Sequence, residues 1–163
     1  MTTRILIVDG QDLFRAAISA WLRANRAAQV DVVADAPDIE AAVPLVARHL
    51  PDVMLVTGAS AGAGLAGLVA RATDLQPELG VLVLIPHDDD QAMVKAMQAG
   101  ARACLLDSTS PQTLVAAIKA VADGHTYFGA DLLQHVSDAL GRSSARERRL
   151  ARLAAARLRG GLG

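Results

Sequence analysis

Residues 51–67 read Pro51-Asp52-Val53-Met54-Leu55-Val56-Thr57-Gly58-Ala59-Ser60-Ala61-Gly62-Ala63-Gly64-Leu65-Ala66-Gly67. A short apolar run stops at a glycine-rich turn, and a helix-like pattern begins near Leu65. A run that is apolar at every position is typical of a parallel strand covered by helices on both faces. Open α/β sheets place their functional sites at the carboxyl ends of such strands, so Thr57 and the following glycines largely determine the chemistry of this site.

Strand and helix patterns alternate on both sides of this run. Short apolar runs predict further strands over residues 4–9, 29–34, 81–85 and 101–106. Apolar residues at three- and four-residue spacing predict a helix after each strand, including one over Leu65–Leu75. This repeating order predicts an α/β fold with a doubly wound parallel sheet.

Several residues mark the ends of these helices. We expect Asp12 to cap the first helix, and Leu13 to lie on its apolar face. Pro37 is expected at the start of the second helix, and Asp88-Asp89-Asp90 at the start of the fourth. Ser110-Pro111 predicts the start of the fifth helix, and the glycines at 100 and 124 predict where the fourth and fifth helices end.

The chain divides into three predicted parts. Residues 1–125 form the α/β domain, and residues 126–143 form an amphipathic helix and a linker. In that helix Leu132, Leu133, Val136 and Leu140 share one side, and Gly141-Arg142-Ser143 reads as the linker. Residues 144–163 form a basic helix, whose start is marked by Ser144-Ala145-Arg146-Glu147, a capping-box pattern.

The composition limits the class of protein. The 163 residues are 52% hydrophobic, with a mean hydropathy of +0.31, which favours a well-buried globular chain. The net charge of −1 gives no overall nucleic-acid signature. Cys104 is the single cysteine, so an internal disulfide is excluded, and we expect it to be a small buried apolar residue. With no apolar run long enough to cross a bilayer, the sequence predicts a cytoplasmic protein.

The glycine-rich loop admits a second interpretation. Thr57-Gly58, Gly62 and Gly64 fit the phosphate loop of short-chain dehydrogenases, and Gly62, Gly64 and Gly67 spell GxGxxG. That family carries its loop after the first strand, whereas this loop follows the third. It also needs a catalytic Tyr with a Lys four residues later, and the single tyrosine, Tyr127, is followed there by Asp131. A dinucleotide site over Gly58–Gly67 is therefore kept as the lesser alternative.

Motifs along most of the chain carry a resemblance to a known family. They are Ile5-Leu6-Ile7-Val8-Asp9 with Leu13-Phe14-Arg15, then His49–Leu55, Val81–Leu84, Asp88–Leu106 and Ser110–Gly124. With these motifs the chain resembles a response regulator of the NarL/FixJ type. The resemblance implies a flavodoxin-like (CheY-like) receiver domain of five parallel strands in the order 2-1-3-4-5. It also implies a helix-turn-helix DNA-binding domain, of which Ser144–Leu153 resembles only the opening, before the recognition helix.

The same resemblance assigns the pocket residues. Receivers hold Mg²⁺ with an acidic pair after the first strand and accept a phosphoryl group on an Asp ending the third. A Thr or Ser ending the fourth strand and a Lys ending the fifth then bind the phosphate. The corresponding residues in this chain are Asp9-Gly10, Thr57, Ile85 and Asp107. We therefore predict a degenerate pocket with no catalytic residue and no cofactor, in which Asp9 is at most a weak Mg²⁺ site.

The sequence thus predicts a signalling module rather than an enzyme. We expect an atypical response regulator that acts in transcriptional regulation through protein–protein contact, without phosphorylation. A homodimer is expected, through the first and fifth helices, the fourth and fifth, or Leu132–Leu140. RNA polymerase or promoter DNA would be partners only of a longer form, and no membrane partner is expected. The alternative is a small-molecule sensor that uses Gly58, Pro86 and His87 beside the vacated pocket.

Overall fold

The computed structural model describes residues 1–57, 64–86, 89–128 and 130–160. Strands and helices alternate through the first part of the chain, and one long helix follows. In chain order the elements are β1 (Thr3–Val8), α1 (Asp12–Ala24), the short 3₁₀ helix η1 (Arg26–Ala28), β2 (Val30–Ala36), α2 (Ile39–His49), β3 (Val53–Thr57), α3 (Leu65–Leu75), β4 (Gly80–Ile85), α4 (Asp90–Gln98), β5 (Ala103–Leu106), α5 (Pro111–Ala122), β6 (Tyr127–Phe128) and α6 (Ala130–Gly160).

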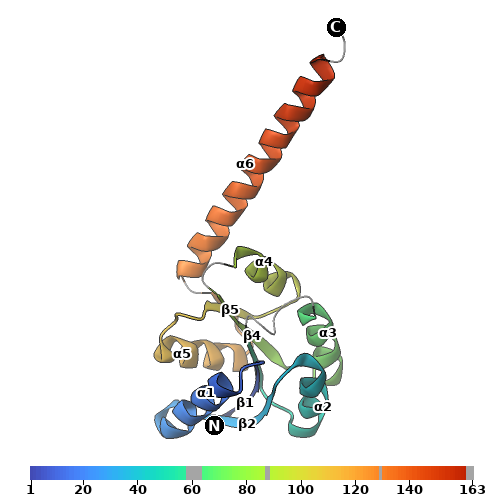
Figure 1. Ribbon diagram of the computed structural model, residues 1–163. Coiled ribbons are helices and arrows are strands. Elements are labelled where there is room, and N and C mark those ends of the chain that lie inside the picture. The colour runs from blue at the N-terminus through green and yellow to red at the C-terminus, as the bar shows by residue number, and fades with distance from the viewer. Residues whose placement is uncertain (58–63, 87–88, 129, 161–163) are drawn as a thin grey trace. The chain divides into compact units, whose positions relative to one another are not determined.

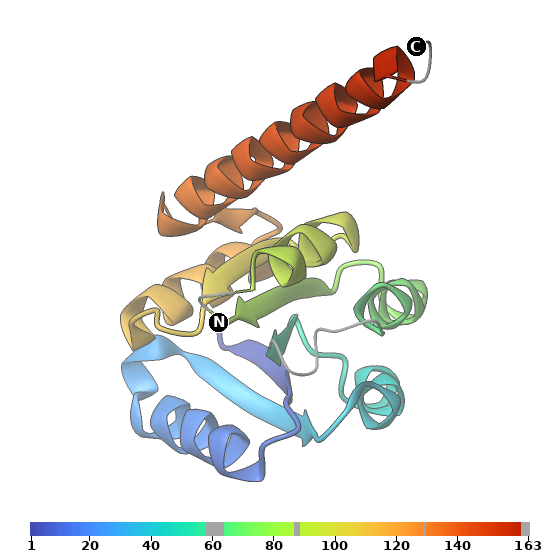
Figure 2. The ribbon, with the colours of Figure 1, turned by 45° about the horizontal axis from the view of Figure 1, so that its top comes forward.

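The strands form one parallel sheet in the order β2-β1-β3-β4-β5-β6. Helices α1 and α5 cover one face, and α2, α3 and α4 cover the other (Figure 1), an arrangement that Figure 2 shows from a second direction. The predicted doubly wound fold and the order 2-1-3-4-5 are confirmed. The predicted number of five strands is wrong by one, because Tyr127–Phe128 adds a two-residue edge strand, with the Tyr127 N–H donating to the Arg102 carbonyl at 2.9 Å.

The strand β3 lies in the middle of the core, as the apolar run Val53–Val56 predicts. All five of its residues are buried. Alternate positions face opposite layers: Val53 and Leu55 belong to a cluster that includes residues of α1 and α5. Met54 and Val56, also fully buried, therefore face the layer of α2, α3 and α4.

Most helix ends follow the predicted signals. Ser110 caps α5 by accepting from the Thr113 N–H, and Asp89 caps α4 by accepting from the Ala92 N–H. Gly100 and Gly124 follow these helices with φ of +94° and +85°, a conformation that side chains disfavour.

Three expectations about helix starts and faces are wrong. Gln11, not Asp12, is the N-cap residue of α1, and Asp12 is the first residue of the helix. Leu13 lies 83% exposed, because the first turn of α1 projects its side chain away from the sheet. Helix α2 begins two residues after Pro37, where Asp38 caps it by accepting from the Ala41 N–H at 2.8 Å.

The chain separates into two compact units, Met1–Gly129 and Ala130–Gly163. The second unit contains α6, a single helix of 31 residues. The predicted linker at Gly141–Ser143 and the predicted capping box at Ser144–Glu147 both fall inside this helix, so neither feature forms. One glycine and two serines flanking an arginine lower helix propensity by about 1 kcal/mol per residue or less, which is insufficient to interrupt a helix with strong formers on both sides.

Membrane-spanning helices need both length and an apolar surface. Within residues 1–57, 64–86, 89–128 and 130–160, no helix is both long enough and apolar enough to span a membrane.

Candidate functional site: the carboxyl edge of the sheet

The predicted pocket residues meet at one edge of the sheet, here called the carboxyl edge. Asp9 follows β1, Thr57 ends β3, Ile85 ends β4 and Asp107 follows β5. Because the strands are parallel and in register, with Val8 beside Val56 and Ile85 beside Leu106, these strand ends lie side by side.

Asp9 and Thr57 are in direct contact at this edge. The Thr57 hydroxyl donates to Asp9 Oδ2 at 2.5 Å, and the Gln11 backbone N–H donates to Asp9 Oδ1 at 2.5 Å. Asp9 is 4% exposed and Thr57 6% exposed, so this hydrogen bond is shielded from water. Both carboxylate oxygens therefore have protein donors, as a buried carboxylate requires.

The other two strand ends have different surroundings. The Ile85 side chain is 1% exposed and contributes only apolar surface. Asp107 is exposed, and its backbone N–H donates to the Ile85 carbonyl at 2.9 Å, which ties the ends of β4 and β5 together. Neither side chain offers a cation or a hydroxyl to an anion bound at the carboxyl edge.

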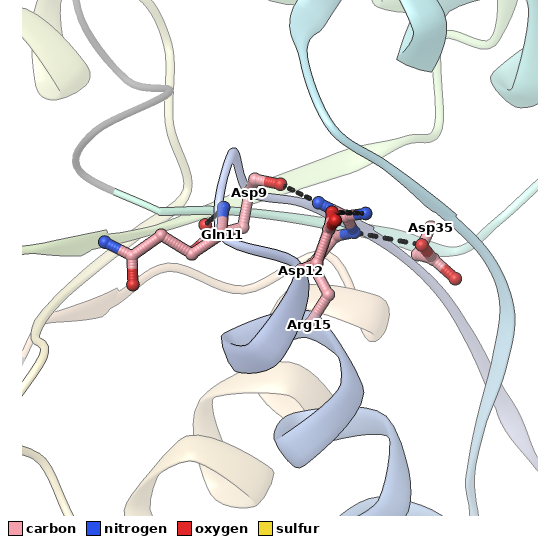
Figure 3. A network of polar contacts seen from close by, with 5 residues as sticks. All are labelled: Asp9, Gln11, Asp12, Arg15 and Asp35. Carbon is pink, nitrogen blue, oxygen red and sulfur yellow. Dashed lines mark hydrogen bonds and ion pairs between the residues drawn. The ribbon is translucent and has the colours of Figure 1, made fainter.

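Arg15, on the first turns of α1, is the centre of a polar network beside Asp9 (Figure 3). Its Nε donates to Asp35 Oδ1 at 3.0 Å, its Nη2 donates to Asp12 Oδ1 at 2.6 Å, and its Nη1 donates to the Asp9 carbonyl. The Arg15 side chain is 12% exposed. Desolvation lowers the pKa of Arg15, but its bonds with Asp35 and Asp12 outweigh that effect and leave the pKa raised.

Sequence reasoning missed Arg15 and Asp35 as members of the site. Arg15 follows Asp12 by three residues, a spacing that brings side chains together on a helix and could have indicated their ion pair. Asp35 lies twenty residues from Arg15 in the chain. Only the parallel pairing of β1 with β2 brings the two together, and no local spacing indicates that contact.

Some predicted site residues fall outside the described part of the chain. These are Gly58 and His87 of the hypothetical ligand pocket, together with Gly62 of the glycine-rich motif. Of the remaining residues, Pro86 is half-buried after β4, Gly64 precedes α3, and Gly67 lies within that helix. The nucleotide-site and ligand-site interpretations therefore stay hypotheses.

The donor set at the carboxyl edge does not fit Mg²⁺. In proteins Mg²⁺ usually keeps several waters and binds through one or two carboxylates together with substrate phosphates. At this edge both oxygens of Asp9 already accept hydrogen bonds, Gly10 has no side chain, and the Asp12 carboxylate is bound by Arg15. Across the described residues, no group of three or more His, Cys, Asp or Glu side chains is arranged to hold a metal ion.

A doubly wound sheet of this order, with Asp9 and Thr57 in contact at the carboxyl edge, is the architecture of flavodoxin-like proteins, the class to which receiver domains belong. Comparison with known proteins gives the family. Residues 5–119 match the family model described as the response regulator receiver domain, and the chain belongs to that family.

Its relatives are transcriptional response regulators. The chain is 34% identical over 126 residues to the transcriptional regulatory protein DegU of Brevibacillus brevis, covering 76% of this chain and 52% of DegU. It is 31% identical over 138 residues to the response regulator UvrY of Escherichia coli K12, covering 82% of this chain and 60% of UvrY. The chain thus spans little more than half the length of these relatives.

A solved structure supports the same assignment. The crystal structure of a LuxR-family two-component response regulator from Aurantimonas sp. SI85-9A1 aligns with a TM-score of 0.74 and 25% identity. The alignment covers 85% of this chain and 97% of the other. The predicted resemblance to NarL/FixJ-type response regulators is confirmed at the level of family and fold.

Proposed function

We propose that this chain is the receiver part of an atypical response regulator that signals through protein–protein contact without aspartyl phosphorylation. The observation that carries the proposal is the buried hydrogen bond between Thr57 and Asp9 at 2.5 Å. Aspartyl phosphorylation needs a carboxylate at the end of β3 as the phosphoryl acceptor, and Thr57 supplies a neutral hydroxyl there instead. The Asp9 carboxylate accepts a hydrogen bond from the Thr57 hydroxyl, and the neighbouring Gly10 supplies no second carboxylate to hold a metal ion.

The remaining strand ends support the proposal electrostatically. Phosphoryl transfer depends on cations and donors that stabilise the transferred charge. Ile85 contributes neither, and Asp107 contributes a negative charge where the phosphate would need a positive one. Each lost stabiliser of this kind raises a barrier by ~2.7–4 kcal/mol, so the losses at Gly10, Ile85 and Asp107 together remove most of the catalytic effect.

We further propose that the protein works in the cytoplasm as a homodimer and takes part in transcriptional regulation. The names of DegU and UvrY support the regulatory role. The candidate dimer faces are α1 with α5, α4 with α5, and the Leu132–Leu140 segment. Contacts with promoter DNA or RNA polymerase would belong to a longer form.

Intact-mass spectrometry after incubation with a small phosphodonor and Mg²⁺ tests the proposal. The unmodified chain should gain no phosphate, and the single Thr57→Asp variant should also stay unlabelled. A variant that restores all four positions should gain some label: Gly10→Asp, Thr57→Asp, Ile85→Thr and Asp107→Lys. The Cβ of the first change has room, because it would lie 3.7 Å from the Pro37 carbonyl oxygen, an ordinary van der Waals contact.

The matched control keeps Thr57 while it carries the other three substitutions, and it should remain unlabelled. A phosphate adduct on the unmodified chain, mapped to the peptide of Asp9 or Thr57, would overturn the proposal. If the quadruple variant folds but never labels, the assignment of these four positions to the receiver pocket is wrong.

A further inference from the structure

We propose that Arg15 is the resident cation of the carboxyl edge. In this view its guanidinium, rather than a metal ion, organises the loop after β1 and positions Asp9 for its hydrogen bond with Thr57. The inference rests on the proposed function, since a site that accepted phosphate would need a bound metal ion instead.

The geometry of the three oxygens around Arg15 supports this role. They come from three different elements: the Asp9 carbonyl after β1, the Asp12 carboxylate at the start of α1, and the Asp35 carboxylate near the end of β2. A planar guanidinium presents its donors in a fixed fork, so it can satisfy several oxygens at once and is always charged. A lysine ammonium, as a point charge, cannot reproduce these three directions.

The burial of Arg15 separates this network from an ordinary surface ion pair. Asp12 is 89% exposed and Asp35 51% exposed, but the Arg15 side chain they share is only 12% exposed. An exposed pair contributes little to stability, whereas removal of a shielded arginine leaves two carboxylates and a carbonyl without their common donor.

The network also connects directly to the site. The Asp9 carbonyl accepts from Arg15, while the two carboxylate oxygens of the same residue accept from the N–H of Gln11 and the hydroxyl of Thr57. Arg15 therefore restrains the backbone of Asp9 at the point where its side chain reaches β3. Arg15 is a positioning residue, and its effect should be local to this loop.

Thermal unfolding and amide hydrogen exchange of the full chain test the inference. The variants are Arg15→Met, Arg15→Lys and, as the matched control on the exposed last turn of the same helix, Arg23→Met. Arg15→Met should lower Tm by ~3–6 °C, Arg15→Lys by less, and Arg23→Met by under ~1 °C. Exchange of the Gln11 N–H should speed up in Arg15→Met while exchange in β4 changes only as far as global stability does.

A second experiment measures Tm over a MgCl₂ series and compares it with Tm in KCl of equal ionic strength. The Tm of the unmodified chain should not respond to Mg²⁺. A saturable Mg²⁺-dependent rise in that Tm would overturn the inference. Equal Tm losses in the Arg15→Met and Arg23→Met variants would overturn it as well, as would unchanged Gln11 exchange. If one of these three outcomes occurs and the unmodified chain gains no phosphate, the role of Arg15 is refuted and the proposed function stands. Phosphate labelling of the unmodified chain refutes the proposed function itself.

Discussion

At the end of β3, Thr57 places a neutral hydroxyl, and not a carboxylate, beside Asp9. A carboxylate at this position beside Asp9 would place two negative charges in contact, which is costly unless a cation or a proton compensates them. The threonine replaces that repulsion with a hydrogen bond of 2.5 Å and leaves one buried charge with two donors. Under the proposed function, this hydrogen bond takes the place of a bound ion at the carboxyl edge, and the edge has no phosphoryl acceptor.

The burial of Cys104 makes the stability of the protein depend on pH. Its thiol is fully buried in β5, and burial raises the pKa of Cys104 from 9.0 to about 12. The folded protein therefore keeps the proton that the unfolded chain loses. Stability linked to this group is intact below pH 9 and is lost as the pH rises toward 12, by about 1.4 kcal/mol per pH unit.

Denaturant titrations between pH 8 and about 11 check this. The Cys104→Ala variant starts from a lower stability because of its cavity, but its stability should fall less steeply above pH 9 than that of the unmodified chain. Contributions that the two proteins share cancel in this comparison, so the difference in slope reports Cys104. Parallel curves would show that the thiol ionises as readily in the folded state as in the unfolded one.

Helix α5 packs so close to the sheet that it leaves no room for a side chain at Gly80. Gly80, the first residue of β4, is buried against α5, and a Cβ there would lie 2.2 Å from Val121 Cγ1 and 3.1 Å from the Val121 carbonyl oxygen. No side chain fits at that distance unless the helix moves. The glycine is therefore required by the packing of α5 on β4, and not by its backbone conformation.

Gly80→Ala should accordingly destabilise the fold by ~1–3 kcal/mol, the usual range for overpacking a core. In the control, Gly67→Ala in α3, the new Cβ meets nothing within 4 Å and should stabilise by about 1 kcal/mol, because alanine is the better helix former. Chemical denaturation measures both effects. The double variant Gly80→Ala/Val121→Ala tests the cause, since removal of Val121 Cγ1 should make the Gly80 substitution less costly.

Charge is distributed unevenly over the whole molecule. Nine basic and fourteen acidic residues precede Ala130, whereas seven arginines and three acidic residues follow from that point. The described arginines at 146, 148, 149 and 152 are exposed on α6. A basic helix of this kind attracts phosphate backbones without reading base edges.

We therefore expect this chain to bind duplex DNA weakly and without sequence preference, with Kd in the range ~10⁻⁴–10⁻⁶ M at physiological salt. Fluorescence anisotropy over a salt series should show affinity falling steeply as salt increases. Replacement of Arg148, Arg149 and Arg152 by glutamine removes up to three phosphate contacts. The slope of log K against the logarithm of salt concentration should therefore become less steep by up to about 3. Preference for one operator over a scrambled duplex would contradict the expectation.

The amino-acid sequence by itself determined the layer architecture. The uniform apolar character of 53–56 and the regular strand–helix alternation predict a parallel sheet with helices on both faces. The end signals at Ser110, Gly100 and Gly124 act within a few residues. Such features are local, so they can be read without coordinates. The family resemblance likewise identified which residues stand at the strand ends, namely Asp9, Thr57, Ile85 and Asp107.

Only the tertiary structure decided how the residues at those ends interact. The Asp9–Thr57 hydrogen bond joins residues 48 apart, and the Arg15–Asp35 pair joins residues twenty apart, so both depend on strand order and register. The continuity of α6 through 141–147 was likewise missed. Weak local breaking signals do not interrupt a helix whose neighbours on both sides favour it, because helix formation is cooperative along the chain.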